Sequence, residues 1–200
     1  MFNDLRGFLA ELEKRGELVR VRERIDDGHE VFSILWELSY REKSPVVILE
    51  RVKDYDIPIL GNVFGKMNRF AMAARFPEDK SYKFYRDLFM DRLTNKGRWL
   101  KPVIVETGPV KEIIVKGGDV DLYDLPVMQW HENDGGPYIT WPVEVTHMEK
   151  YGTNLGTYRM MIHDKQSTGL MCNLFQDIGV HLKKAKSLGL SSMPCSVVIG

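Results

Sequence analysis

The chain of 200 residues carries 28 basic and 28 acidic side chains, so its formal net charge is zero, and apolar residues make up 44% of it. This composition is typical of a globular protein with a hydrophobic core, and the charge balance gives no support for nucleic acid or a membrane surface as the main partner. We expect a soluble cytoplasmic protein, because no apolar run approaches the roughly 20 residues that span a bilayer and two cysteines are too few for a disulfide framework.

The first hundred residues show helical and strand-like patterns in alternation. A helix is predicted to begin at a capping residue, Asn3 or Asp4, and to end at Gly16. The elements predicted after it are a strand at 18–25, a helix at 29–42, strands at 45–52 and 57–65, and helices at 69–76 and 80–93. This order predicts an N-terminal α/β region over residues 1–101.

The pattern changes after Pro102, where short β-rich runs are separated by turn residues. The strands predicted here are 103–106, 112–118, 138–149, 154–164, 168–174 and, after a helix at 176–189, 193–200. Their spacing favours an antiparallel sheet or small barrel over residues 102–200, so the predicted class of the whole chain is α+β. The last apolar run stops at the final residue, which favours a chain that continues beyond it.

The segment GTNLGTYRMM, residues 152–161, contains the two side chains with the most distinctive chemistry. Asn154 and Arg159 lie five residues apart, so a regular strand would point them to opposite faces, and a bulge at Gly156 would bring them together. An amide oxygen suits Mg²⁺ or Mn²⁺, and a guanidinium suits phosphate or carboxylate. The plainer alternative is an asparagine in a turn and an arginine in a surface ion pair.

Other motifs narrow the choice of chemistry. The sequence has no GxxxxGK[ST] loop and no GxGxxG fingerprint, which weakens an ordinary ATP or NAD interpretation. It also lacks the GxSxG pattern of nucleophilic hydrolases. The loop WHENDGGPYIT, residues 130–140, either approaches a ligand or forms a polar turn before a strand.

Three segments together resemble the N-terminal portion of the UbiD family of prenylated-FMN-dependent reversible decarboxylases. They are DLRGFLAELEKRGELVRV, DVDLYDLPVMQWHENDGGPYIT and TNLGTYRMMIHDKQSTGLM, and the resemblance extends over essentially the whole chain. It implies an N-terminal α/β region followed by part of a split β-barrel similar to flavin reductases. It also implies a carboxy-lyase that acts on an aromatic or α,β-unsaturated carboxylic acid through a covalent adduct with the cofactor, releasing CO₂.

The resemblance assigns roles to particular positions. Arg159 matches the catalytic arginine near the substrate carboxylate, and Asn154 matches a ligand of the metal that bridges the flavin phosphate. The implied cofactors are prenylated FMN, Mn²⁺ or Mg²⁺, and a potassium ion. The implied partners are a small carboxylic acid, a flavin prenyltransferase as cofactor source, and further copies of the chain in a homo-oligomer. The cofactor-binding residues implied by the family pattern are Thr140, Asn154, Thr157, Tyr158, Arg159 and Gln176.

The sequence departs from the family pattern at Asp177, where members usually have a metal-binding histidine. An aspartate can bind Mn²⁺ or Mg²⁺, so Asp177 is the expected second metal ligand. Alternatively the site is lost, or His181 takes over. The resemblance implies that the catalytic glutamates of the family lie beyond residue 200. Two other functions therefore stay open, a non-catalytic partner subunit and a flavin- or metal-binding module completed by another chain.

Overall fold

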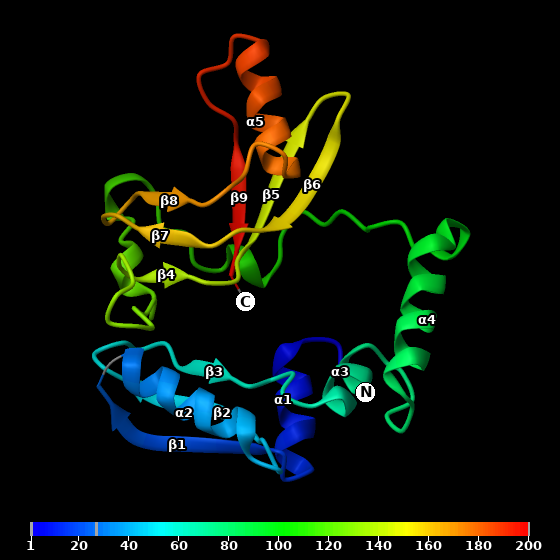
Figure 1. Ribbon diagram of the computed structural model, residues 1–200. Coiled ribbons are helices and arrows are strands. Elements are labelled where there is room, and N and C mark those ends of the chain that lie inside the picture. Colours follow the sequence, from blue (N-terminus) through cyan, green and yellow to red (C-terminus); the bar gives the residue numbers. More distant parts are fainter. Residues whose placement is uncertain (1, 27, 200) are drawn as a thin grey trace. The chain divides into compact units, whose positions relative to one another are not determined.

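The computed structural model describes residues 2–26 and 28–199 of the chain. They form two compact units, the first made of residues 2–26 and 30–119 and the second of residues 28–29 and 120–199. Helices and strands occur in both units, which confirms the predicted α+β class (Figure 1). In this part of the chain no helix is long and apolar enough to cross a membrane.

The first unit is built around a three-stranded sheet with the order β1-β2-β3. Strands β1 and β2 are parallel, and β2 and β3 are antiparallel. A parallel pair requires a crossover connection, and helix α2 provides it between β1 and β2. The elements are α1 (Leu5–Lys14), β1 (Leu18–Ile25), α2 (Gly28–Tyr40), β2 (Val46–Val52), β3 (Ile59–Gly61), α3 (Met67–Ala73) and α4 (Tyr82–Thr94).

Local sequence signals determine both ends of α1. The carboxylate of Asp4 accepts a hydrogen bond of 2.7 Å from the backbone N–H of Gly7, which satisfies one of the free donors at the helix start. Gly16 follows the helix with a φ of 70°, a left-handed conformation that glycine adopts without strain. The predicted helix is therefore confirmed, and of the two predicted capping residues Asp4 is the one that caps it.

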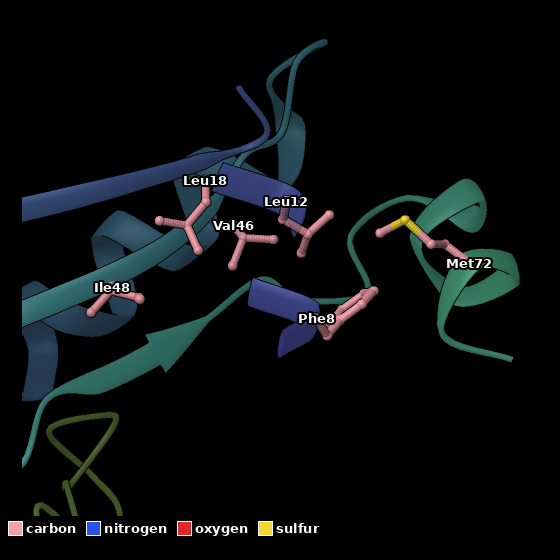
Figure 2. Packing of buried hydrophobic residues seen from close by; sticks show 6 residues of the cluster. All are labelled: Phe8, Leu12, Leu18, Val46, Ile48 and Met72. Carbon is pink, nitrogen blue, oxygen red and sulfur yellow. The ribbon is translucent and has the colours of Figure 1, made fainter. Parts of the chain in front are cut away.

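Apolar side chains from α1, β1, β2 and α3 form the core of the first unit (Figure 2). Leu12 and Val46 are completely buried, and Phe8 is 3% exposed. Burying side chains of this size contributes about 1.5–3 kcal/mol each. The six buried members of the cluster are Phe8, Leu12, Leu18, Val46, Ile48 and Met72.

One charged side chain, Arg69 of α3, is completely buried in this unit. Its Nε lies 2.9 Å from a carboxylate oxygen of Glu17, and its Nη1 donates to the backbone oxygen of Asn62 at 3.0 Å. Nη2 donates to the backbone oxygen of Ser44. A buried guanidinium is tolerated only when it is paired and hydrogen-bonded, and Arg69 meets both conditions.

The second unit contains two three-stranded sheets and one helix, α5 (Figure 1). One sheet has the order β4-β7-β8 and the other β6-β5-β9, and all their strand pairs are antiparallel. Helix α5 packs on β5 and β6. The elements are β4 (Tyr138–Ile139), β5 (Val143–Met148), β6 (Gly152–Thr157), β7 (Met160–Ile162), β8 (Thr168–Leu170), α5 (Asp177–Ser187) and β9 (Cys195–Val198).

The strands predicted at 103–106 and 112–118 are wrong. In the structure residues 103–106 lie between short 3₁₀ turns at Lys96–Arg98 and Pro109–Lys111, residues 112–118 run from the second of these turns into a third at Gly117–Asp119, and neither run pairs with any described strand. Their apolar side chains are exposed, with Ile104 at 95% and Ile113 at 85%. A β pattern needs a neighbouring strand to form a ladder, and these residues have none.

Candidate functional site

The chain passes from one sheet of the second unit to the other between Thr157 and Met160. Strand β6 ends at Thr157 in the sheet with β5 and β9, and β7 begins at Met160 in the sheet with β4 and β8 (Figure 1). Asn154 and Arg159 therefore do not share one bulged strand. The register from Val143 opposite Thr157 to Met148 opposite Gly152 runs without a shift, so the predicted bulge at Gly156 is also wrong.

Asn154 lies in β6 directly opposite Thr146 of β5. Its side chain is half-buried, and its Nδ2 is buried with no hydrogen-bond partner among the described residues. The neighbouring hydroxyl does not serve it, because Thr146 Oγ1 is hydrogen-bonded to Nδ1 of His181 at 2.9 Å. His181 of α5, the alternative metal ligand in the sequence analysis, is thus held in the interior at 5% exposure.

Arg159 occupies the short connection between β6 and β7, with an exposed side chain. Its Nε lies 2.9 Å from the sulfur of Met171, and its guanidinium carbon lies 5.8 Å from the centre of the Tyr138 ring. The described part of the chain places no carboxylate within ion-pair distance of it. The predicted alternative of a surface ion pair is therefore not what the structure has, and the cation is available to an anionic ligand.

Thr140 and Arg159 lie at the same end of the β4-β7-β8 sheet, directly after β4 and directly before β7. Ile139 pairs with Met160, so continuing this register by one residue places Thr140 opposite Arg159. On the other side, the backbone oxygen of Arg159 accepts a hydrogen bond of 3.2 Å from the N–H of Met171. The exposed hydroxyl of Thr140 and the guanidinium thus share a rim of the sheet.

Tyr158 anchors the connection from inside. Its side chain is 8% exposed and packs over Gly156, where an added Cβ would lie 2.4 Å from the ring. Its hydroxyl oxygen accepts a hydrogen bond of 3.4 Å from the N–H of Ile178 in the first turn of α5. Tyr158, which directly precedes Arg159, is thus hydrogen-bonded to the start of the helix that carries Asp177.

Glu144 of β5 is a residue that the sequence analysis missed. It is completely buried, and its Oε2 accepts a hydrogen bond of 3.0 Å from the backbone N–H of Tyr158. Its Oε1 is buried without a partner among the described residues. Burial raises the pKa of the Glu144 carboxyl, and the N–H of Tyr158 opposes this shift. A charged residue inside a short β run was the available signal.

The remaining predicted residues lie near the start of α5 and at the end of β6. Gln176 precedes the helix, and its side-chain oxygen accepts a hydrogen bond of 2.7 Å from the N–H of Asn173. Asp177 is the first helical residue and is exposed, a position where the helix dipole favours a carboxylate. Thr157 is exposed at the end of β6. The structure shows no direct contact that joins Asp177 to Asn154.

The donor chemistry of the site fits a hard divalent cation only in part. Asn154 and Asp177 supply the oxygen donors that Mg²⁺ and Mn²⁺ prefer. Across residues 2–26 and 28–199, however, no three histidine, cysteine, aspartate or glutamate side chains gather closely enough to hold a metal ion. These residues therefore fit a metal that takes its other ligands from elsewhere, such as a phosphate.

Comparison with known families identifies both parts of the chain. Residues 9–89 match the N-terminal domain of 3-octaprenyl-4-hydroxybenzoate carboxy-lyase, UbiD_N. Residues 101–200 match the Rift-related domain of the same enzyme, UbiD. An uncharacterized protein of Aquifex aeolicus is 31% identical over 218 residues, an alignment that covers all of this chain and 44% of the relative.

Solved structures of a decarboxylase and of a UbiD-class enzyme have the same fold. Vanillic acid decarboxylase of Sedimentibacter hydroxybenzoicus, in its closed form, matches with a TM-score of 0.87 and 29% identity over all of this chain and 43% of its own. The UbiD-class enzyme HmfF of Pelotomaculum thermopropionicum, in complex with FMN, matches with a TM-score of 0.82 and 25% identity over 98% of this chain and 42% of its own. An evolved dimeric form of HmfF, in complex with prFMN, matches with a TM-score of 0.81 and 26% identity over 98% of this chain and 44% of its own. The chain thus spans less than half the length of these relatives.

Proposed function

The chain belongs to the UbiD family, and from this premise we propose that it carries part of the active site of a prenylated-FMN-dependent decarboxylase or carboxylase. The proposed substrate is an aromatic or α,β-unsaturated carboxylic acid. The observation that carries the proposal is the exposed guanidinium of Arg159, which has no carboxylate partner in the described structure and lies beside the connection between the two sheets. Vanillic acid decarboxylase and HmfF, which share this fold, support the reaction class.

Arg159 would bind the carboxylate of the substrate. A guanidinium presents a planar pair of donors that matches the two carboxylate oxygens. In decarboxylation the bond between the carboxylate carbon and the substrate breaks, CO₂ leaves, and a proton takes its place on the carbon. The negative charge beside Arg159 disappears in the process, so Arg159 serves catalysis best by orienting the carboxylate without stabilising the ground state more than the transition state.

The residues around the connection fit a phosphate-bearing flavin with a divalent metal. Thr140, Thr157 and Gln176 offer exposed polar side chains, and Tyr158 offers backbone beside them. The amide oxygen of Asn154 and a carboxylate oxygen of Asp177 would hold Mn²⁺ or Mg²⁺ against the phosphate. When bound, prenylated FMN would supply the reactive centre for the decarboxylation chemistry. HmfF structures with FMN and with prFMN support this choice of cofactor.

The same family membership supports further parts of the proposal. The two sheets of the second unit would belong to a split barrel, with a domain division near residues 101 and 102. A flavin prenyltransferase would provide the cofactor, a potassium ion would accompany the divalent metal, and the protein would work as a homo-oligomer in the cytoplasm. These statements follow from the family and not from contacts within this chain.

Replacement of the guanidinium tests the proposal. Arg159→Ala in the cofactor-loaded protein should abolish exchange of ¹³C-labelled bicarbonate into vanillate and other aromatic or α,β-unsaturated acids. Flavin absorbance of the purified protein should be unchanged, because Arg159 faces the substrate in this proposal. The control is Arg22→Ala, which removes an exposed arginine from β1 of the first unit. Near-normal exchange in Arg159→Ala would remove the residue from its catalytic role.

The same preparation distinguishes the alternative functions. If the wild-type protein binds flavin and metal but exchanges no carboxylate with any acid, it is a binding module or a partner subunit. Asn154→Ala should lower the Mn²⁺ and flavin content of the purified protein, whereas unchanged content of both would count against its metal role.

A further inference from the structure

Glu144 is a buried carboxylate on the central strand of a sheet. It lies on β5, the central strand of the β6-β5-β9 sheet (Figure 1), opposite Gly156 on one side and Val197 on the other. The side chain is 0% exposed. Taking a carboxyl group out of water costs free energy unless hydrogen bonds replace the lost hydration. The role of Glu144 therefore depends on the hydrogen-bond partners of its two carboxylate oxygens.

The first oxygen fixes the connection that presents Arg159. Strand β6 ends at Thr157, so the N–H of Tyr158 lies beyond the ladder, and it donates to Glu144 Oε2 at 3.0 Å. This bond holds the backbone of the residue immediately before Arg159. The Tyr158 ring over Gly156 and its hydroxyl at the start of α5 complete the anchor.

The second oxygen belongs to a side chain on the same face of the sheet as Asn154. Glu144 is opposite Gly156, and Thr146 is opposite Asn154, so Glu144 and Asn154 are diagonal neighbours on the same face. Such neighbours are separated by about 7–8 Å, within reach of a long side chain such as that of Glu144. Glu144 Oε1 is an acceptor without a partner, and Asn154 Nδ2 is a donor without one in the described structure, so the two atoms are not bonded to each other there and a rotation of the side chains would bring them into contact.

A hydrogen bond between these two groups would also orient the amide. The nitrogen and the oxygen of an asparagine side chain lie at opposite corners of its amide group. If Nδ2 donates to Glu144, the oxygen points away from Glu144 and is left free for another ligand. An ionised carboxylate can only accept, so it selects this one orientation of the two.

We propose that Glu144 is a positioning residue for both candidate residues, holding Arg159 through the N–H of Tyr158 and orienting Asn154 through its side-chain amide. The inference rests on the proposed function, because it assigns the freed oxygen of Asn154 to the divalent metal. Groups that orient metal ligands typically change metal affinity about 10–100-fold when they are replaced.

Two substitutions separate the two contacts. Glu144→Gln keeps an oxygen that accepts from the N–H of Tyr158 but presents its NH₂ group to Asn154, which must then turn its oxygen toward residue 144 and away from the metal. Glu144→Leu fills similar space and loses both contacts. Glu149→Gln is the matched control, because it removes an exposed carboxylate just beyond the end of β5.

The experiment measures Mn²⁺ affinity in the presence of FMN, together with ¹⁵N NMR signals of the Tyr158 backbone amide and the Asn154 side-chain amide. We expect the Mn²⁺ affinity to fall at least tenfold in Glu144→Gln and Glu144→Leu and to be unchanged in Glu149→Gln. The Tyr158 signal should keep its position in Glu144→Gln and shift in Glu144→Leu. The Asn154 signals should shift in both.

The NMR signals decide the positioning role independently of the proposed function. If the wild-type protein binds no Mn²⁺ with FMN, the metal assignment fails, while shifts of the Tyr158 and Asn154 signals in the pattern described still support the two contacts. Asn154 signals that are the same in wild type, Glu144→Gln and Glu144→Leu would overturn the inference. So would a Mn²⁺ affinity within twofold of wild type in both variants.

Discussion

Gly156→Ala should destabilise the second unit by pushing the Tyr158 ring out of its site. The backbone of Gly156 is paired regularly with Glu144, so the substitution tests space and not strand pairing. An added Cβ would lie 2.4 Å from Cε2 of Tyr158 and 2.6 Å from its hydroxyl oxygen. Such approaches are far inside van der Waals contact, and a ring that is 8% exposed has little room to move.

The expected cost follows from the contacts that the ring would lose. Overpacking of this kind costs about 1–3 kcal/mol. If the backbone of Tyr158 moves with its ring, the hydrogen bond to Glu144 is also weakened, and a bond to a charged group contributes about 1.5–3 kcal/mol. Because the ring can relax in part, we expect a total loss of about 2–4 kcal/mol in local stability.

Hydrogen exchange of the β5 and β6 amides measures this loss, because it reports the opening free energy of these strands separately from the first unit. Gly108→Ala is the control: Gly108 has an extended backbone with a φ of −175° and nothing within 4 Å of an added Cβ. Its effect should stay within about 0.5 kcal/mol. In a Tyr158→Ala background, Gly156→Ala should cost less than about 0.5 kcal/mol. An equal cost in both backgrounds would refute the steric reasoning.

Three further predictions concern buried polar groups. Arg69→Met should lower the stability of the first unit by about 3–5 kcal/mol in urea unfolding, because it leaves Glu17 and two backbone oxygens unpaired; a loss below 1 kcal/mol would contradict this. Thr146→Val should cost about 1–3 kcal/mol in hydrogen exchange of β5, because Nδ1 of His181 loses its partner; unchanged exchange would show that the bond contributes nothing. Because burial raises the pKa of Glu144 above its ordinary 4.5, the folded state binds this proton more tightly than the unfolded state, and stability should fall as pH rises from 4.5 through the raised pKa. In Glu144→Gln the free energy of unfolding should fall less over this pH range than in the wild type. An equal fall in both proteins would contradict the prediction.

Local signals in the sequence predicted the first unit well. The cap at Asp4, the stop at Gly16 and the alternation of helix and strand depend on neighbouring residues, which the sequence displays directly. The burial of Arg69 could not be predicted in this way. Its partners Glu17 and Ser44 come from distant parts of the chain, and nothing near Arg69 in sequence indicates that its charge is buried.

The second unit shows where strand patterns mislead. In VEVTHM the apolar residues Val143 and Val145 favour one face as the buried one, but the structure buries the other, with Glu144, Thr146 and Met148. The pattern is reversed because α5 packs on β5 and the Tyr158 ring lies over Gly156, which is opposite Glu144. Because of this reversal, the sequence analysis did not identify Glu144 as a candidate site residue.

The change of sheet after Thr157 was equally hidden. Residues 154–164 have strand propensity throughout, and nothing in them marks the point at which the pairing partner changes from β5 to β4 and β8. The sequence did single out Asn154 and Arg159, from the chemistry of their side chains. Which strands carry them depends on pairings between distant residues, and only the structure shows those.

Native mass spectrometry of the protein produced together with a flavin prenyltransferase tests the central claim most directly. We predict that each chain carries one prenylated FMN and one divalent metal ion, and that Asn154→Ala lowers the occupancy of both. A wild-type protein that stays free of flavin, in cells where the prenyltransferase makes the cofactor, would contradict the proposed function.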